Sequence, residues 1–148
     1  MASTHLSLHY HVVFSTKSRH PWIPAAWRDD LHGYLGGCLR VLEAVPEAVG
    51  GVADHVHLLL GLRATHRLAD VVREEKKASS RWIRDEQKIS AFTWQEGYGA
   101  FTVSQSNVVA VREYIAAQPE HHRKRSFQEE YLELLKKHEI ELDDRFIW

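Results

Sequence analysis

The sequence predicts an α+β fold of the ferredoxin-like type, an antiparallel sheet with two helices on one face. The chain has 148 residues, of which 44% are hydrophobic and 26% charged, enough for about one domain with a single core. Its predicted elements follow the order strand, helix, strand, strand, helix, strand. An additional C-terminal helix follows, so we expect it at an edge of the sheet or on the face that the first two helices leave open.

The beginning of the chain predicts one strand and one helix. Residues 6–16, LSLHYHVVFST, alternate and then run apolar with Tyr, Val and Phe, as strands do. Pro24 suits the first turn of a helix, and apolar residues recur every three or four positions from there to Leu42. Gly36 and Gly37 each cost a helix interior roughly 1 kcal/mol, so we expect close packing against a neighbour at this pair.

The middle of the chain predicts a hairpin, a second helix and a last strand. Residues 45–52 and 54–62 are apolar and β-branched enough to form two paired strands. Across 67–85, apolar residues recur at helical spacing while Lys and Arg gather on another face, which predicts a helix with a basic stripe. Residues 91–104, AFTWQEGYGAFTVS, predict a strand, a glycine turn and a short extended segment.

Two more helices are expected after the sheet. Ser104 is a predicted N-cap for a helix that continues until Pro119. The stretch SFQEEYLELLKKHEI has apolar residues at helical intervals and predicts an acidic C-terminal helix and tail over about 126–148. Because no internal repeat or low-complexity linker interrupts the chain, we expect residues 1–148 to form a single domain.

Composition limits where the protein acts. No apolar run approaches the ~20 residues of a membrane helix, and we expect no membrane partner. The N-terminus lacks the basic start and apolar stretch of a secretion signal, so we expect a cytoplasmic protein. Cys38 is the single cysteine, which excludes an internal disulfide and a CxxC site, and we expect it in the core.

The small net charge of -1 hides an uneven distribution. Residues 129–144 carry seven carboxylates against two lysines, whereas residues 63–88 carry eight Lys or Arg against five Asp or Glu. A local positive potential can steer an anionic ligand, although a mixed solvated surface would explain the same charges.

Two histidines stand out in GGVADHVHLLLGL, residues 50–62. Since strand residues two apart point the same way, His55 and His57 share a face while Val56 points to the other. Adjacent imidazoles can bind a metal ion or donate to a phosphate. The pair could equally be two solvent-facing histidines on a half-buried strand, because the chain has 11 histidines.

Tyr114 and Gln118 lie four residues apart in the helix after Ser104 and therefore share a face of that helix. Its apolar residues can pack on the sheet and bring this face toward the histidines. A tyrosine in an amphipathic helix is also often a boundary residue with a hydrogen-bonded hydroxyl.

Together these segments resemble the IS200-like single-tyrosine transposases of the HUH nuclease superfamily, named for a His-hydrophobic-His motif. YHVVFSTKSRHP at 10–21 is similar to the family's first strand and DHVHLLL at 54–60 to its histidine motif. KKASSRWIR at 76–84 is similar to its basic second helix, and the stretch from residue 94 to residue 138 to its C-terminal half.

The resemblance implies an enzyme that cleaves and rejoins single-stranded DNA at insertion-sequence ends. Carried over by position, Tyr114 would be the nucleophile, and His55, His57 and Gln118 would hold a divalent metal, Mg²⁺ or Mn²⁺. It also implies a 5′-phosphotyrosine intermediate, DNA hairpins as partners, and a homodimer whose tyrosine helix reaches the partner's histidines.

The residue types suit this chemistry. A phenol that attacks a phosphodiester keeps the energy of the bond in a phosphotyrosine for the joining step, so ATP is not needed. Because the reference pKa of tyrosine is ~10, some group must take its proton, and no residue in the sequence identifies itself as that base.

Binding of DNA requires a basic track and surfaces on which bases stack. The basic candidates are Arg73, Lys76, Lys77, Arg81 and Arg84 in the second helix and Arg123, Lys124 and Arg125 in the segment HHRKR. The aromatic candidates, each of which could instead be a core residue, are Trp22, Trp94 and Tyr98.

Two other functions remain open from the sequence. Ferredoxin-like sheets also bind RNA on an open face, so the chain could be a non-catalytic nucleic-acid binder, although it lacks the expected paired sheet aromatics. It could also be a protein in which the two histidines hold a metal for stability alone.

Overall fold

The computed structural model describes residues 3–141, and within them four strands form one antiparallel sheet in the order β2-β3-β1-β4. The strands are β1 (His9–Ser15), β2 (Val45–Gly51), β3 (His55–Gly61) and β4 (Gly99–Val103). The helices are α1 (Ala25–Val41), α2 (Leu68–Glu86), α3 (Val108–Ala116), α4 (Gln118–His121) and α5 (Phe127–Lys137). This order confirms the ferredoxin-like α+β prediction and the β2-β3 hairpin.

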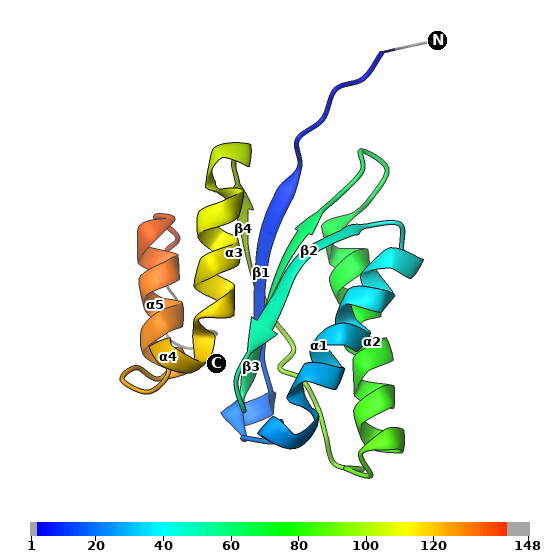
Figure 1. Cartoon of the computed structure of the whole chain (residues 1–148), viewed down its shortest axis with the longest axis vertical. Coiled ribbons are helices and arrows are strands. Elements are labelled where there is room, and N and C mark those ends of the chain that lie inside the picture. The colour runs from blue at the N-terminus through cyan, green and yellow to red at the C-terminus, as the bar shows by residue number, and fades with distance from the viewer. Residues whose placement is uncertain (1–2, 142–148) are drawn as a thin grey trace.

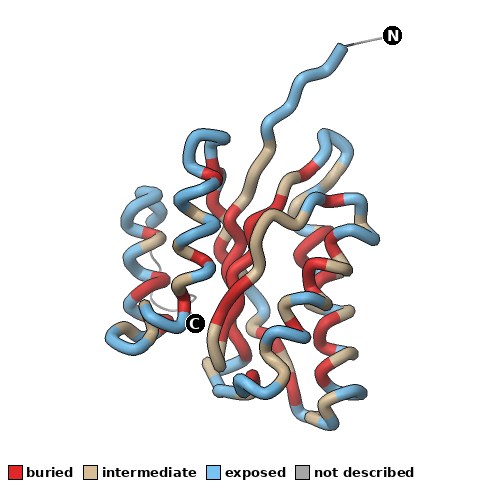
Figure 2. The backbone as a smooth tube through the Cα atoms, in the orientation of Figure 1, coloured by how far each residue is buried: buried red, intermediate tan, exposed pale blue. Residues whose placement is uncertain are grey.

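The sheet is covered on both faces (Figure 1). Helices α1 and α2 lie on one face, and α3, α4 and α5 lie on the other. The α1–α2 side buries alternate strand residues, among them Phe14 of β1 and Val56, Leu58 and Leu60 of β3. Buried residues run along the strands and the inner sides of the helices (Figure 2). The face that the sequence leaves open is therefore closed, because α5 packs beside the predicted tyrosine helix.

Packing on this second face uses residues at helical spacing. Helix α3 contacts the sheet through Val108 and Ile115. Helix α5 contacts Val13 and Phe101 of the sheet through three side chains one turn apart, Phe127, Tyr131 and Leu135. A capping box between Ser126 and Glu129 begins α5, as expected for a helix that starts abruptly after a turn. The far end of the expected acidic tail, residues 142–148, lies outside the described residues.

The region 91–98 is a loop and not the strand that the sequence predicts. Trp94 makes only an isolated bridge with Thr16, and its indole N–H donates to Ser79 Oγ at 2.9 Å. The Lys76 ammonium donates to the carbonyls of residues 95, 96 and 97 at 2.8, 3.2 and 2.7 Å. These side-chain bonds from α2 replace the ladder that a strand would need.

The tyrosine helix is shorter at both ends than predicted. A 3-10 helix, Gln105–Asn107, precedes α3, and Ser104 Oγ hydrogen-bonds with Ser106 Oγ at 3.0 Å instead of capping the helix. The helix stops at Ala116, and Ala117, with φ -90° and ψ 9°, turns the chain into the short α4 that contains Pro119. This break aims Gln118 at the sheet.

The glycine pair in α1 does not mark a close contact. A Cβ at Gly37 would meet nothing within 4 Å, and a Cβ at Gly36 would meet only Pro46, at 3.8 Å. Cys38 beside them is partly exposed, which corrects its expected place in the core. Across the described part of the chain, no helix is both long and apolar enough to span a membrane.

Helix α3 packs closely against Gly50 of β2, at a position where a larger residue would not fit. A Cβ at Gly50 would lie 2.7 Å from both Cγ2 and the carbonyl oxygen of Ile115. We expect Gly50→Ala to displace α3 and to lower the free energy of unfolding by ~1–3 kcal/mol, measured by urea denaturation. Gly37→Ala is the control, since the added methyl there meets open space and favours the helix. Equal stability of the Gly50→Ala variant and the wild type would contradict this docking of α3.

Candidate active site at the histidine pair

His55 and His57 point from β3 toward α3 and α5. In the ladder they lie opposite Ser15 and Val13 of β1. Both side chains are fully buried, because the two helices cover this face of the sheet. The two histidines share a face, as the strand alternation predicts, but they are not solvent-facing.

The structure brings Tyr114 and Gln118 to this pair. The Tyr114 ring, on α3, lies 5.8 Å from the His57 ring between centroids. Gln118, the first residue of α4, is fully buried and its Oε1 lies 3.0 Å from His55 Nε2. These contacts join, within one chain, all four residues that the resemblance assigns to the site.

Glu130 of α5 lies at the centre of this group and is 2% exposed. Its Oε1 faces three imidazole nitrogens, the Nε2 atoms of His57, His55 and His122, at 3.0, 3.3 and 3.2 Å. Its Oε2 accepts hydrogen bonds from Gln118 Nε2, at 2.8 Å, and from the Tyr114 hydroxyl. One carboxylate thus joins the tyrosine, the amide and the histidines.

The outer nitrogens of the histidine pair are also held. His55 Nδ1 donates to Asp54 Oδ1 at 2.7 Å. His57 Nδ1 lies 2.8 Å from Nε2 of His11, a β1 residue that is 4% exposed. These contacts fix both rings with Nε2 toward Glu130, the arrangement usual for histidines that bind a metal through Nε2.

The local environment separates the charges of the histidines. Burial disfavours the imidazolium of His55, but its bonds to Asp54 and Glu130 outweigh burial and raise its pKa to about 9. Burial lowers the pKa of His57 to about 4 and that of His11 to about 3. At neutral pH, His55 is therefore cationic, while His57 and His11 are neutral.

The pKa values of Tyr114 and Glu130 shift in opposite directions. Burial, together with the neighbouring carboxylate, raises the pKa of Tyr114 well above its usual value. Burial alone would raise the pKa of Glu130, but the neighbouring imidazoles of His122, His55 and His57 hold it far below its usual range. At neutral pH, Tyr114 therefore keeps its proton and donates it to an ionised carboxylate.

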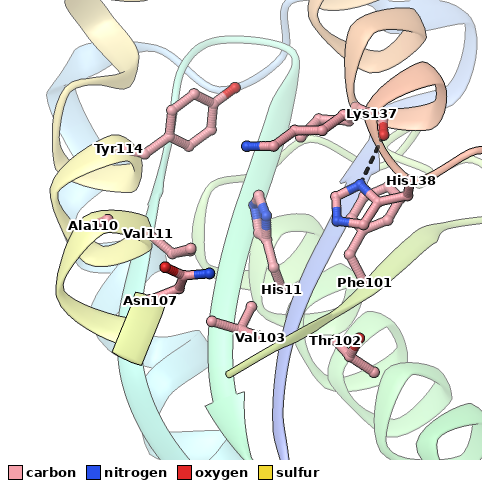
Figure 3. A pocket seen from close by; sticks show the side chains of 11 residues that line it. His11, Phe101, Thr102, Val103, Asn107, Ala110, Val111, Tyr114, Lys137 and His138 are labelled. Atoms are coloured by element: carbon pink, nitrogen blue, oxygen red, sulfur yellow. Dashed lines mark hydrogen bonds between the residues drawn. The ribbon is translucent and has the colours of Figure 1, made fainter. Parts of the chain in front are cut away.

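A cavity of about 340 Å³ adjoins Tyr114 between α3 and α5. Figure 3 shows Tyr114 on one side of it, Lys137 and His138 opposite, and His11 and Phe101 on the sheet. His138 stacks on Phe101 with ring centroids 4.4 Å apart. The cavity therefore offers a cation and flat rings beside the tyrosine.

The predicted basic track is divided between the two faces of the sheet. Arg73, Lys76, Lys77, Arg81 and Arg84 lie on α2, on the face opposite Tyr114 (Figure 1). The Lys76 ammonium is bound to loop carbonyls, and burial lowers its pKa to about 8.

The second basic segment follows α4 directly after His122 and consists of Arg123, Lys124 and Arg125. Arg123 pairs with Glu120 at 3.3 Å, and Arg125 pairs with Glu133. Of the aromatic candidates, Trp94 is a core residue, while Trp22 and Tyr98 are partly buried.

Three residues of this site are absent from the sequence-based prediction, His11, His122 and Glu130. Glu130 has a local signal, since it lies three residues after Phe127 on the apolar side of α5. His11 alternates in phase with the inward-facing Val13. His122 has no such signal, because its direction depends on the turn between α4 and α5.

Known transposases resemble this chain in sequence and in fold. The ISDra2 transposase TnpA of Deinococcus radiodurans is 29% identical over 119 residues, covering 75% of this chain and 84% of the relative. A crystal structure described as a transposase from Deinococcus radiodurans R1 has a TM-score of 0.63 and 26% identity, over 80% of this chain and 96% of that one. A REP-associated tyrosine transposase bound to a REP hairpin shares the fold, with a TM-score of 0.60 and 13% identity, over 82% and 74% of the two chains.

The family model described as "Transposase IS200 like" matches residues 4–118. The match includes the histidine pair, Tyr114 and Gln118 and ends before His122 and Glu130. Because it spans well over half of the sequence, this chain belongs to the IS200-like transposase family.

Proposed function

We propose that this transposase cleaves and rejoins single-stranded DNA through a covalent 5′-phosphotyrosine on Tyr114, with a divalent metal ion bound by His55, His57 and Gln118. One observation carries the proposal. The Tyr114 hydroxyl and the Nε2 atoms of both histidines meet on the same buried carboxylate, Glu130. A phosphodiester that binds beside this carboxylate would contact the nucleophile and the metal ligands together.

The transfer step can be written with this chain's own groups. The Tyr114 oxygen attacks phosphorus and forms a new P–O bond, while the bond from phosphorus to the 3′-oxygen breaks and that oxygen takes a proton from water to leave as a 3′-hydroxyl. Glu130 Oε2 accepts the phenolic hydrogen bond and so orients the Tyr114 oxygen, while the proton passes to water as the P–O bond forms, because the pKa of this carboxylate lies far below that of the phenol. Reversal of the same step on a new 3′-hydroxyl rejoins the strand.

The residues present fit a divalent ion. Gln118 Oε1 and His55 Nε2 lie 3.0 Å apart, close enough to share one ion, and imidazole and amide ligands accept Mn²⁺ or, with added waters, Mg²⁺. When bound, the ion would polarise a phosphate oxygen and offset charge in the transition state.

The covered sheet argues against a non-catalytic RNA binder that uses an open face. Helices α3 and α5 bury the face that such a protein would offer to bases. The third possibility, a metal held only for stability, gives no reason for a tyrosine hydroxyl to point at the cluster.

We infer that DNA approaches over the turn at residues 121–125, on the same face as Tyr114. Changing Arg123 and Lys124 to glutamine should then reduce the slope of log affinity against log salt by ~0.7 for each phosphate that the protein no longer neutralises. Changing Lys77 and Arg81 on α2 in the same way should leave the slope for a hairpin substrate unchanged. Filter binding over a salt series measures the slope for both variants. A smaller slope for the Lys77 and Arg81 variant, with no change for the Arg123 and Lys124 variant, would place the DNA on the α2 face.

We also propose a homodimer. Strands β2 and β4 end the sheet, so their free edges can pair with a second copy. Since α3 docks on its own sheet through Ile115 and Gly50, we infer that each Tyr114 acts beside the histidines of its own chain.

The test is a covalent adduct. Hairpin-bearing single strands labelled on the 3′ side of the cleavage point are incubated with the protein and Mg²⁺ or Mn²⁺ and run on a denaturing gel. We expect an SDS-resistant labelled band that chelation removes. Equal reaction with the double-stranded form would contradict single-strand specificity, and no adduct on any element end would contradict the proposal.

A further inference from the structure

We propose that His122 and Glu130 bind the metal ion in addition to the histidine pair and Gln118, which gives a site with three imidazoles and one carboxylate beside the amide. The catalytic use of this site rests on the proposed function, whereas the ligand set itself is tested by metal binding alone. Both added ligands come from the segment after residue 118, where the family match ends.

His122 carries the first argument. Its side chain is 9% exposed, and its Nε2 is buried without a hydrogen-bond partner among the described residues. Its Nδ1 lies 2.8 Å from the carbonyl oxygen of Arg125, which can only accept, so Nδ1 carries the proton. In the neutral ring, Nε2 therefore presents a lone pair to Glu130 Oε1, 3.2 Å away.

His55 has the same orientation. Its Nδ1 donates to the Asp54 carboxylate, so Nε2 of the neutral ring presents a lone pair to the same Oε1, 3.3 Å away. Two lone pairs and a carboxylate oxygen that face one another repel unless positive charge lies among them. Without a metal, a proton on His55 supplies this charge. A metal cation at this point turns all three groups into ligands, and the outer bonds at Nδ1 already hold the rings as metal ligands are held.

The spacing also suits an ion. The ligand atoms of His55, His122 and Glu130 lie within 4.8 Å of one another; His57 lies outside this group, although its Nε2 is 3.0 Å from the same Glu130 oxygen. Protein ligands lie roughly 2 Å from a first-row metal, so these side chains need to move only slightly to surround one ion. Three imidazoles and one carboxylate favour Mn²⁺, Co²⁺ or Zn²⁺ over Mg²⁺, which prefers oxygen ligands and water.

This ligand set makes Glu130 a bridge between the ion and the nucleophile. With Oε1 on the metal, Oε2 still accepts from the Tyr114 hydroxyl and from Gln118 Nε2. The phenol is then held at a fixed place relative to the ion, which lowers the entropy cost of attack.

Metal binding without DNA tests the proposal. Metal-free full-length protein is titrated with Co²⁺, Mn²⁺ and Mg²⁺ and followed by the visible spectrum of bound Co²⁺ and its displacement. We expect tighter binding of Co²⁺ and Mn²⁺ than of Mg²⁺, and at least about tenfold weaker Co²⁺ binding by Glu130→Gln and by His122→Gln. Glu133→Gln, which changes a 65% exposed carboxylate on the same helix, should bind as the wild type does.

X-ray absorption by Co²⁺ or Zn²⁺ bound to the wild type keeps the test independent of how the variants fold. Three imidazoles around the metal support the proposal. Two imidazoles, or unchanged binding by both Glu130→Gln and His122→Gln, overturn it and leave the ligand set of the proposed function standing. Wild-type protein that binds no divalent ion overturns both.

Discussion

Replacing Tyr114 with phenylalanine is expected to abolish the covalent DNA adduct, with a fall in cleavage rate of at least ~10⁴-fold, because removal of a nucleophile leaves only binding and electrostatic effects. The ring still fills its place beside His57 and His11, so the packing of α3 is kept. Glu130 loses one of its donors but retains Gln118 and the imidazoles. A quantitative gel assay with labelled single strands measures the loss.

Hairpin affinity separates this loss from misfolding. The Tyr114→Phe variant should bind the hairpin within about twofold of the wild type, since the hydrogen bond that is lost, about 1.5–3 kcal/mol to a charged acceptor, lies within the protein and not between protein and DNA. Tyr98→Phe is the matched control, because Tyr98 is partly buried and packs against the core on the other face of the sheet. An adduct that survives in Tyr114→Phe would assign the nucleophile to another residue.

Replacing Glu75 with leucine is expected to stabilise the protein by about 3 kcal/mol at pH 7. Glu75 is fully buried in α2, and among the described residues neither of its carboxylate oxygens has a hydrogen-bond partner. Burial raises the pKa of Glu75 from 4.5 to about 8, so the folded protein must hold a proton that the unfolded chain releases at pH 7. Each pH unit between the two pKa values costs ~1.4 kcal/mol.

The sign of the pH dependence follows from the same difference. Between pH 4.5 and about 8, the folded state holds more protons on Glu75 than the unfolded state, so stability falls as pH rises through this window. Urea denaturation at several pH values should show a downward slope in the wild type. Glu75→Gln should be flatter, and Glu75→Leu both flatter and more stable.

Glu74 supplies the control for this series. Its side chain is 41% exposed and pairs with Arg73 at 3.5 Å, so Glu74→Gln should change stability by less than about 0.5 kcal/mol and keep the wild-type slope. Destabilisation by Glu75→Leu would show that Glu75 has a partner after all.

Local patterns predicted most of the scaffold. The alternation of β3 placed His55 and His57 on one face and Val56 on the other, and the structure confirms it. The spacing of Tyr114 and Gln118 put them on the side of the chain that meets this face, although a break at Ala117 and not a continuous helix orients Gln118. Their chemical roles remain predictions.

Long-range packing accounts for what the sequence analysis missed. Glu130 belongs to a segment rich in carboxylates, and only the docking of α5 on Val13 and Phe101 shows that this one faces inward. Glu75 lies on the buried side of α2, four residues from both Val71 and Ser79. Because its side chain is charged, the sequence pattern groups it with the exposed polar residues of the helix and does not predict its burial. The sequence also does not show which glycines are needed for packing. Gly50 is needed because it lies against Ile115, whereas Gly37 has open space beside it.

The complete enclosure of His55, His57 and Gln118 has a kinetic consequence. On the proposed function, a DNA strand cannot reach these side chains past α3 and α5 as they are packed, so we expect the helices to part before the phosphate arrives. As substrate concentration increases, the turnover rate should reach a plateau set by this opening and not by bond breaking. Reaction velocity would then respond to viscosity and to the stability of the α5 contact with the sheet more than to the leaving group.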